Sequence, residues 1–211
     1  MRELEEIREF VEREIVPRYN DFDAGHDIEH VHTVISQALS LAQYYPEVDQ
    51  CIVLVSAAYH DLGLVNGREH HHTDSARIIR EDVRLRQWFS EEEIHTIADA
   101  AEDHRASSDH EPRTIYGRIV AEADRIIDGE TIVRRALQYG MKHEPGLDRE
   151  GQYLRLMEHM REKYDYGGYL KLWIPQSDNA KRLEEFRQTL ANEKAFRRLF
   201  DTIYDSLTIK T

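Results

Sequence analysis

The sequence predicts an all-α protein, and three observations carry that prediction. Apolar residues recur every three or four positions along most of the 211 residues, which is the spacing of one helix face. No segment alternates apolar and polar residues as a half-buried strand does. Neither an internal repeat nor a low-complexity stretch interrupts the pattern. The length suits one domain with its own core, so we predict a main helical domain at 1–145 and a helical extension packed on it at 146–211.

Four helices are expected in the first half of the chain. The first begins near Leu4 and ends at Pro17, which does not continue a helix. The third is apolar on nearly every side over residues 51–59 and could be a buried strand by composition. It runs past the usual strand length, so we predict a buried helix. Thr73 and Asp74 are expected to cap the fourth. The expected ranges are 4–15, 27–45, 48–64 and 73–83.

The second half of the chain is also helical in pattern. Ser90 followed by three glutamates is a capping-box signature, and it opens a helix through Ala101. A longer helix is expected from Ile115 to Ile127, after a polar loop at 107–112. The remaining expected features are breaks at Gly140 and at Pro145-Gly146, a helix at 153–160, an aromatic loop at 164–175 and a last helix at 183–207.

The composition disfavours several classes of partner. The chain has 28 Lys and Arg against 41 Asp and Glu, a net charge of −13 with neutral His. Such a surface repels phosphate backbones and anionic lipid, so we expect no nucleic-acid or membrane surface. No apolar run is long enough to cross a bilayer, and the first residues lack the apolar core of a secretory signal. The single cysteine, Cys51, cannot pair within the chain, which fits a cytoplasmic location.

Five polar residues interrupt the predicted apolar helix faces. They are His30, His60, Asp61, His104 and Asp124. Taken singly, a histidine on such a face is usually a hydrogen-bonded core residue, and an aspartate is usually a cap or half of an ion pair. Together they bring imidazole nitrogen and carboxylate oxygen from several helices toward one interior. That donor set suits a divalent metal, and it leaves coordination positions for water, as a hydrolytic site needs.

Three motifs resemble the HD-domain superfamily of metal-dependent phosphohydrolases. Residues 25–31 (GHDIEHV) resemble its first motif, in which the later histidine is the ligand. Residues 57–63 (AAYHDLG) resemble its His-Asp doublet, and residues 117–125 (GRIVAEADR) resemble the segment with the final aspartate. The resemblance covers about residues 20–140, and it implies an HD-type metal-binding helical domain.

The resemblance also implies a set of metal ligands. A first ion would be held by His30, His60, Asp61 and Asp124. Some relatives bind a second ion through two further histidines, with Asp61 as the bridge. His71 and His104 fall in the matching interval, and His70 and His72 are alternatives to His71 because spacing does not rank neighbours in a loop. The implied cofactor is one or two divalent ions, chosen from Mn, Mg, Ni, Co or Fe.

The activity that the resemblance implies is hydrolysis of a phosphate ester, of a nucleotide or a related small molecule, by metal-activated water. Asp61 and Asp124 would set the coordination and accept a proton. Arg125 would contact phosphate, or would instead pair with Glu122 or Asp128. Glu122 stands where relatives often have aspartate.

Two other functions fit the same residues. One is a non-catalytic module that senses or binds a metal or nucleotide, and the other is an oxygenase with a di-iron pair. The expected partner is a small-molecule phosphate substrate. The apolar face of the last helix fits either packing within the monomer or the seam of a homodimer.

Overall fold

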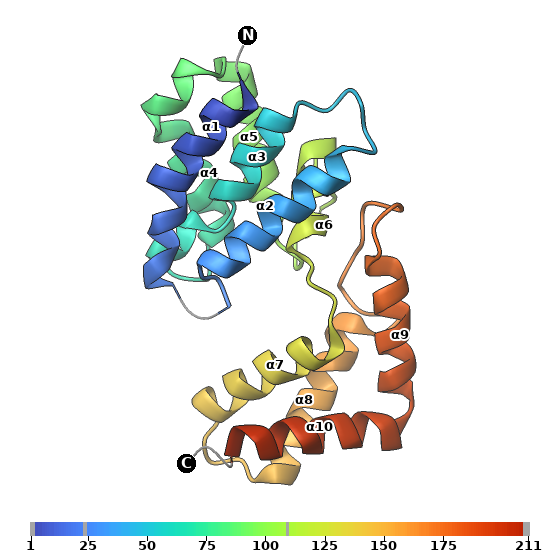
Figure 1. The fold of residues 1–211 in the computed structure, drawn as a ribbon. Helices are drawn as coiled ribbons and strands as arrows, with labels where there is room; N and C mark the ends of the chain where they lie inside the picture. Colours follow the sequence, from blue (N-terminus) through green and yellow to red (C-terminus); the bar gives the residue numbers. More distant parts are fainter. Residues whose placement is uncertain (1–2, 23–24, 109, 209–211) are drawn as a thin grey trace. The chain divides into compact units, whose positions relative to one another are not determined.

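The computed structural model describes residues 3–22, 25–108 and 110–208. Over these residues the chain forms ten α-helices and no strand, which confirms the all-α prediction. Contacts divide the chain into two compact units (Figure 1). The N-terminal unit comprises residues 1–125 and 172–177, and the C-terminal unit comprises residues 126–171 and 178–211. Among the described residues no helix is both long and apolar enough to span a membrane.

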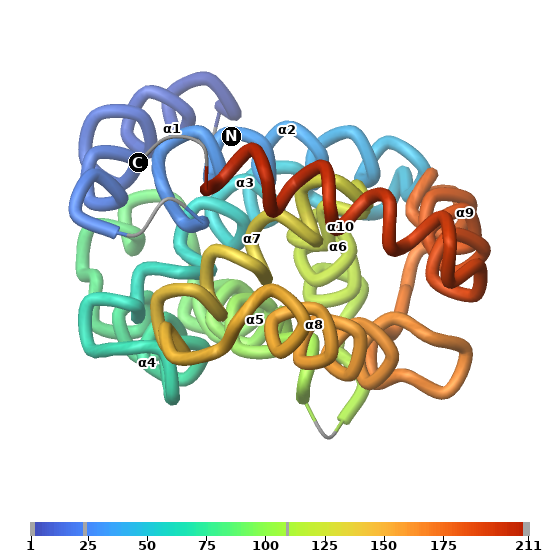
Figure 2. Tube along the Cα trace, turned by 90° about the horizontal axis from the view of Figure 1, so that it is seen from below, coloured from blue at the N-terminus to red at the C-terminus, as the bar shows by residue number. Residues whose placement is uncertain are grey.

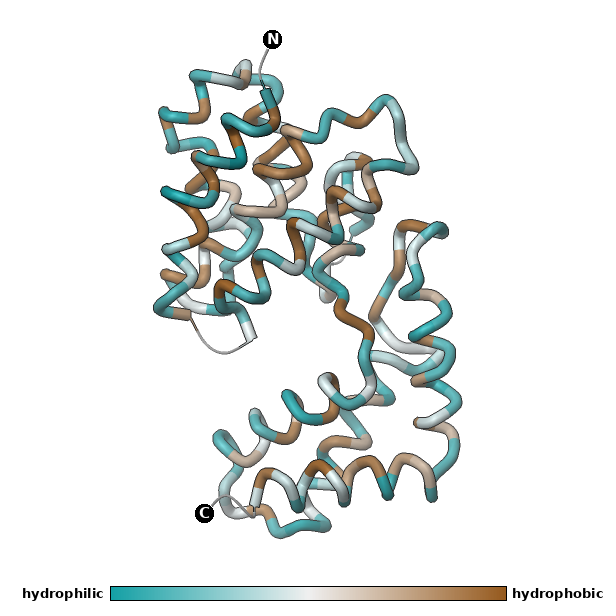
Figure 3. Tube along the Cα trace, viewed as in Figure 1, coloured by the Kyte–Doolittle hydropathy of each residue, from teal (hydrophilic) through white to brown (hydrophobic). Residues whose placement is uncertain are grey.

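A helix that is buried over all but its first residue lies at the centre of the N-terminal unit. This helix, α3, is buried at every residue from Cys51 to Tyr59, and it is mostly hydrophobic (Figure 3). Helices α1, α2, α5 and α6 pack against it, and α4 packs on α5. The predicted choice of helix over strand for this segment is therefore confirmed. The six helices are α1 Leu4–Phe10, α2 Ile28–Ala42, α3 Gln50–Tyr59, α4 His71–Glu81, α5 Glu91–Glu102 and α6 Ile115–Asp124.

Side-chain caps fix where several of these helices begin. Asp27 accepts a hydrogen bond from the amide of His30 and opens α2. Ser90 forms the predicted capping box at the start of α5. The start of α4 differs from the prediction, because the helix begins at His71, before the expected caps Thr73 and Asp74. His71 therefore lies on the first turn of α4 instead of in a loop.

Two predicted helix ends are wrong, whereas the first helix ends where predicted. Helix α1 continues as a π-helical stretch over Val11–Ile15, and Pro17 lies at the start of the separate 3-10 turn Val16–Asp21, where its missing N–H is not needed. Helix α3 ends at Tyr59 and not at residue 64. The helix expected to reach Ile127 ends at Asp124, since the next residue has φ −82° and ψ 85°, outside the helical region.

Four helices make up the C-terminal unit. They are α7 Gly129–His143, α8 Arg149–Tyr164, α9 Asn179–Ala191 and α10 Glu193–Thr208. Helix α7 packs against α8 and α10, and α9 packs against both α8 and α10 (Figure 2). Because of this packing, contacts place the boundary between units after Arg125, whereas the sequence suggested residue 145. That the extension packs on the main domain stays a prediction.

Two expectations for the C-terminal helices are wrong. Helix α7 continues through Gly140. The glycine leaves room for the guanidinium of Arg155, because a Cβ at this position would lie only 2.2 Å from it. The predicted last helix is two helices that divide at Asn192. The apolar face of α10 packs inside the unit, where the ring of Phe200 lies 5.1 Å from that of Tyr153. A homodimer stays a prediction.

A buried carboxylate ties the end of α3 to the segment after α4. The Asp82 side chain, 8% exposed, accepts hydrogen bonds from the Tyr59 hydroxyl at 2.8 Å and from Arg84 Nη2 at 2.6 Å. Burial alone would raise the pKa of Asp82, but the hydrogen bonds from Arg84 and Tyr59 outweigh it and lower that pKa. The contribution to stability is therefore complete above the unfolded pKa of about 4 and is lost as pH falls below it.

We expect Asp82→Asn to lower the free energy of unfolding by about 2 kcal/mol at pH 7, because charge-assisted hydrogen bonds are lost at a buried site. The variant should also lose less stability than the wild type between pH 5 and pH 3. Urea unfolding across that pH range measures both effects. Glu81→Gln is the control, since Glu81 forms an exposed ion pair with Arg77 and its replacement should change nothing measurable. If the two variants had the same free energy of unfolding across this pH range, the stabilising role of the Asp82 hydrogen bonds would be wrong.

Candidate metal centre

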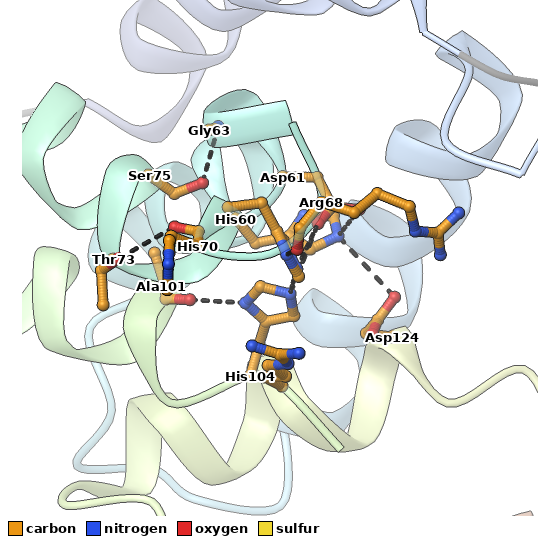
Figure 4. Close-up of polar contacts among 12 residues, drawn as sticks. His60, Asp61, Gly63, Arg68, His70, Thr73, Ser75, Ala101, His104 and Asp124 are labelled. Atoms are coloured by element: carbon orange, nitrogen blue, oxygen red, sulfur yellow. Dashed lines mark hydrogen bonds and ion pairs between the residues drawn. The ribbon is translucent and has the colours of Figure 1, made fainter. Parts of the chain in front are cut away.

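The His60-Asp61 doublet lies directly after α3, at the centre of the N-terminal unit. Both side chains are almost fully buried, with residue exposures of 0% and 2%. Neighbouring helices bring in the other predicted residues: His30 from the first turns of α2, His71 from the start of α4, His104 from just after α5 and Asp124 from the end of α6. Figure 4 shows His60, Asp61, His104 and Asp124 converging from these separate elements.

One group of four residues surrounds a common point. Asp61 Oδ2 lies 3.1 Å from His60 Nε2 and 3.6 Å from His30 Nε2. Asp124 Oδ1 lies 3.3 Å from His30 Nε2 and 3.7 Å from His60 Nε2. The two Nε2 atoms are 3.4 Å apart. We call His30, His60, Asp61 and Asp124 the first ligand group.

A second group uses the other oxygen of the same aspartate. Asp61 Oδ1 lies 3.5 Å from His71 Nε2 and 3.4 Å from His104 Nε2, and these two nitrogens are 3.2 Å apart. We call Asp61, His71 and His104 the second ligand group. Because its two oxygens face different groups, Asp61 is placed to bridge them.

The structure brings only one of the three consecutive histidines to Asp61. The His70 side chain is 72% exposed and pairs with Glu69 at 3.6 Å. His72 belongs to neither ligand group among the described residues. His71 is the one that points inward, because α4 begins there and its first turn faces the doublet.

The orientation of three imidazoles is fixed by backbone carbonyls. In His60, His71 and His104, Nδ1 bonds the carbonyl oxygen three residues earlier, at 2.8, 2.8 and 2.5 Å. A carbonyl only accepts, so each Nδ1 carries a proton, and in the neutral ring Nε2 offers its lone pair to the centre. This arrangement of a histidine ligand and a backbone acceptor is typical of metal sites. His30 differs, since its Nδ1 is buried and has no hydrogen-bond partner among the described residues.

The distances fit a metal ion in each group. Ligand atoms that share an ion at 2.0–2.2 Å lie about 3.0–3.6 Å from one another, by simple geometry of octahedral and tetrahedral sites. The nitrogen–oxygen distances within the two groups are 3.1–3.7 Å, close to that range, and all ligand atoms of a group lie within 4.8 Å of one another. Four imidazoles and two carboxylates, without thiolate, suit a divalent transition metal.

The electrostatics of the site also favour a cation. Burial by itself would raise the pKa of Asp61, but the surrounding imidazoles, His60 foremost, hold it well below its usual value. Burial would also raise the pKa of Asp124, but hydrogen bonds with His30 and His60 hold that pKa well below its usual value. Burial, then the charge of His104, lowers the pKa of His71 to about 4, so that ring is neutral at pH 7. Burial alone would lower the pKa of His30 and His60, but Asp61 and Asp124 outweigh it and raise both values. A divalent cation would take the place of the protons that these rings share with the two carboxylates.

Arg125 does not have the environment expected of a phosphate-binding residue. It is 5% exposed, and its Nη1 donates to the carbonyl of His104 at 3.2 Å and to that of Ala121. These contacts favour a role for Arg125 in positioning His104. They do not favour the direct contact with phosphate that was predicted. The sequence could not distinguish these roles, because the carbonyl of His104 is 21 residues away along the chain.

Sequence reasoning missed the role of a fully buried carboxylate next to the site. Glu122 is 0% exposed and accepts hydrogen bonds from the amides of Trp173, at 2.6 Å, and Ile174, at 3.3 Å, and from the Ser177 hydroxyl. It thereby holds segment 172–177 on α6, two residues before Asp124. A charged residue inside the apolar run 119–123 was the available signal, but the partners lie more than fifty residues away.

We expect Glu122→Ala to lower the free energy of unfolding by about 3 kcal/mol, since two buried amides and a hydroxyl lose their acceptor. Glu122→Gln should lose less, because its amide oxygen still accepts from the two amides. Chemical denaturation of the full chain measures the difference. An exposed glutamate, Glu130, which pairs with Arg134, gives the matched control Glu130→Ala. If both alanine variants were equally stable, the structural role of Glu122 would be wrong.

Comparison with known proteins found a match to a protein family. A family model described as HD domain matches residues 27–128, a range that includes every residue of both ligand groups. No curated protein and no solved structure matches the chain.

Proposed function

Because the chain carries an HD domain over residues 27–128, we propose that it is a metal-dependent phosphohydrolase that cleaves a phosphate ester of a nucleotide or a related small molecule. Members of this family are typically metal-dependent hydrolases that bind divalent metals, and some members are non-catalytic. The observation that carries the proposal is the sharing of Asp61 by two groups of ligand atoms. A purely structural ion would need only one closed group of four ligands.

The proposal assigns roles to the residues of the centre. His30, His60, Asp61 and Asp124 would hold one ion, and His71 and His104 would hold a second one with Asp61. When bound, a divalent ion lowers the pKa of a coordinated water toward neutrality and neutralises charge on phosphoryl oxygens. Asp61 and Asp124 would orient the centre and accept a proton during hydrolysis.

Substrate would reach the centre beside Asp124. The side chain of Asp124 is 25% exposed, whereas those of His30, His60, Asp61 and His104 are at most 5% exposed. The net charge of −13 disfavours a long phosphate backbone as substrate and so favours a small phosphate ester. The imidazole-rich donor set favours Mn, Fe, Co or Ni over Mg, which prefers oxygen ligands.

Turnover with defined metals tests the proposal. The full chain, freed of metal and reloaded with Mn²⁺, Co²⁺, Ni²⁺, Fe²⁺ or Mg²⁺, is expected to hydrolyse at least one nucleotide or generic phosphate ester. His60→Ala should bind less metal and lose that turnover. Absence of turnover with every metal, together with unchanged metal binding by His60→Ala, would contradict the proposal. Stoichiometric nucleotide binding without product would instead support a sensor module.

A further inference from the structure

A buried tyrosine outside the matched range contacts the backbone of the doublet. Tyr19 lies in the 3-10 turn Val16–Asp21, before the HD match begins at residue 27, and is 0% exposed. Its hydroxyl donates to the carbonyl of Ala58 at 2.9 Å. The same hydroxyl accepts from the amide of Asp61 at 3.3 Å. Two backbone groups on either side of His60 are thus held by one side chain.

These contacts occupy the groups that a helix end leaves without partners. Helix α3 ends at Tyr59, so the carbonyls of its last turn and the amides that follow need other partners. The His60 ring bonds the carbonyl of Ala57. Tyr19 takes the carbonyl of Ala58 and the amide of Asp61. The chain therefore leaves the helix in one defined conformation, and this conformation turns both doublet side chains toward the centre.

The position of the hydroxyl is itself well determined. The Tyr19 ring packs edge-on against Phe22, with centroids 5.3 Å apart, and lies 6.5 Å from the His60 ring. The 3-10 turn that carries it packs on α2, the helix that supplies His30. A rigid donor and acceptor at this point constrains Asp61 more than a water molecule would.

We infer that Tyr19 is a positioning residue for the metal centre, which fixes the backbone of Asp61 so that its two oxygens face the two ligand groups. The inference rests on the proposed function for its metal. It assigns to the N-terminal segment, outside the family match, a part in building the site.

The substitution Tyr19→Phe tests this inference because it removes only the hydroxyl and keeps the ring. Tyr59→Phe is the matched control: Tyr59 is equally buried, and its hydroxyl makes one bond to Asp82, away from the centre. Co²⁺ binding is measured by titration and by the visible absorption spectrum of the bound ion. We expect Co²⁺ affinity to fall about 10-fold in Tyr19→Phe, with a changed spectrum, and to be unchanged in Tyr59→Phe.

Amide hydrogen exchange at Asp61 gives a readout that needs no metal. It should be faster in Tyr19→Phe and unchanged in Tyr59→Phe, even if both variants lose similar stability. Wild-type Co²⁺ affinity, spectrum and exchange in Tyr19→Phe would overturn the inference while leaving the proposed hydrolysis intact. Conversely, a wild-type protein that binds Co²⁺ but hydrolyses no ester with any of the five metals would refute the proposed function. The binding comparison would still support or overturn the role of Tyr19.

Discussion

Replacing Asp61 by asparagine is expected to remove metal from both ligand groups and to lower hydrolysis by about 10³-fold or more. One oxygen of Asp61 lies against the first ligand group, and the other lies against the second. Asparagine has nearly the same shape, but it lacks the negative charge, and its amide nitrogen is a donor that cannot ligate a cation. No other group in this centre therefore has an effect on both ions at once.

Asp49→Asn is the matched control for that substitution. Asp49 caps the opposite end of α3 by accepting from the amide of Cys51, and asparagine caps a helix about as well as aspartate. Elemental analysis and turnover of the two variants give the comparison. A variant Asp61→Asn that keeps wild-type metal content or turnover would show that this aspartate does not bridge the two groups.

Gly63→Ala is the second substitution with a large expected effect, and it acts through the backbone. A Cβ on Gly63 would lie 2.0 Å from the carbonyl oxygen of His71 and 2.6 Å from the amide of Ser75. The amide of Gly63 also donates to the Ser75 hydroxyl at 2.8 Å, so the loop after the doublet lies directly on the first turn of α4. The backbone of the loop and that of α4 are both held by packing, so neither can shift without a large loss of stability. The loop must therefore separate from α4.

That separation moves His71 away from Asp61, so the second ligand group should fail before the first. We expect Gly63→Ala to lose the second ion, to lower turnover about 100-fold and to lower the free energy of unfolding by about 3 kcal/mol. Metal content, turnover and urea unfolding are the measurements. Gly146→Ala is the control, because a Cβ there meets nothing within 4 Å. Two ions and wild-type stability in Gly63→Ala would disprove the close-packing argument.

The parts of the fold that follow local rules were predictable from the sequence. Asp27 and Ser90 begin helices because each side chain accepts from an amide three residues later, a signal contained in four residues. The residues of the first ligand group were predictable because each interrupts an apolar face, where a polar side chain needs a specific partner. The structure brings those residues together as expected.

The parts that depend on distant contacts were not predictable. The choice of His71 over its neighbours depends on the residue at which α4 begins, and that start is set by packing on the loop after Asp61. Tyr19 and Glu122 act on groups 42 and more than 50 residues away, so the sequence does not show their partners. Only Glu122 carries a local signal, because its charge interrupts the apolar run 119–123. Arg125 follows Asp124 in sequence, yet its guanidinium bonds the backbone of His104.

The number of ions per chain tests the central claim most directly, because that claim is the sharing of Asp61 by two ligand groups. Elemental analysis of the Mn²⁺- or Co²⁺-loaded protein should give two ions in the wild type and one in His71→Ala. The adjacent substitution His70→Ala should leave two, since that side chain is exposed and lies in neither group. A single ion in the wild type that persists in His71→Ala would contradict the account.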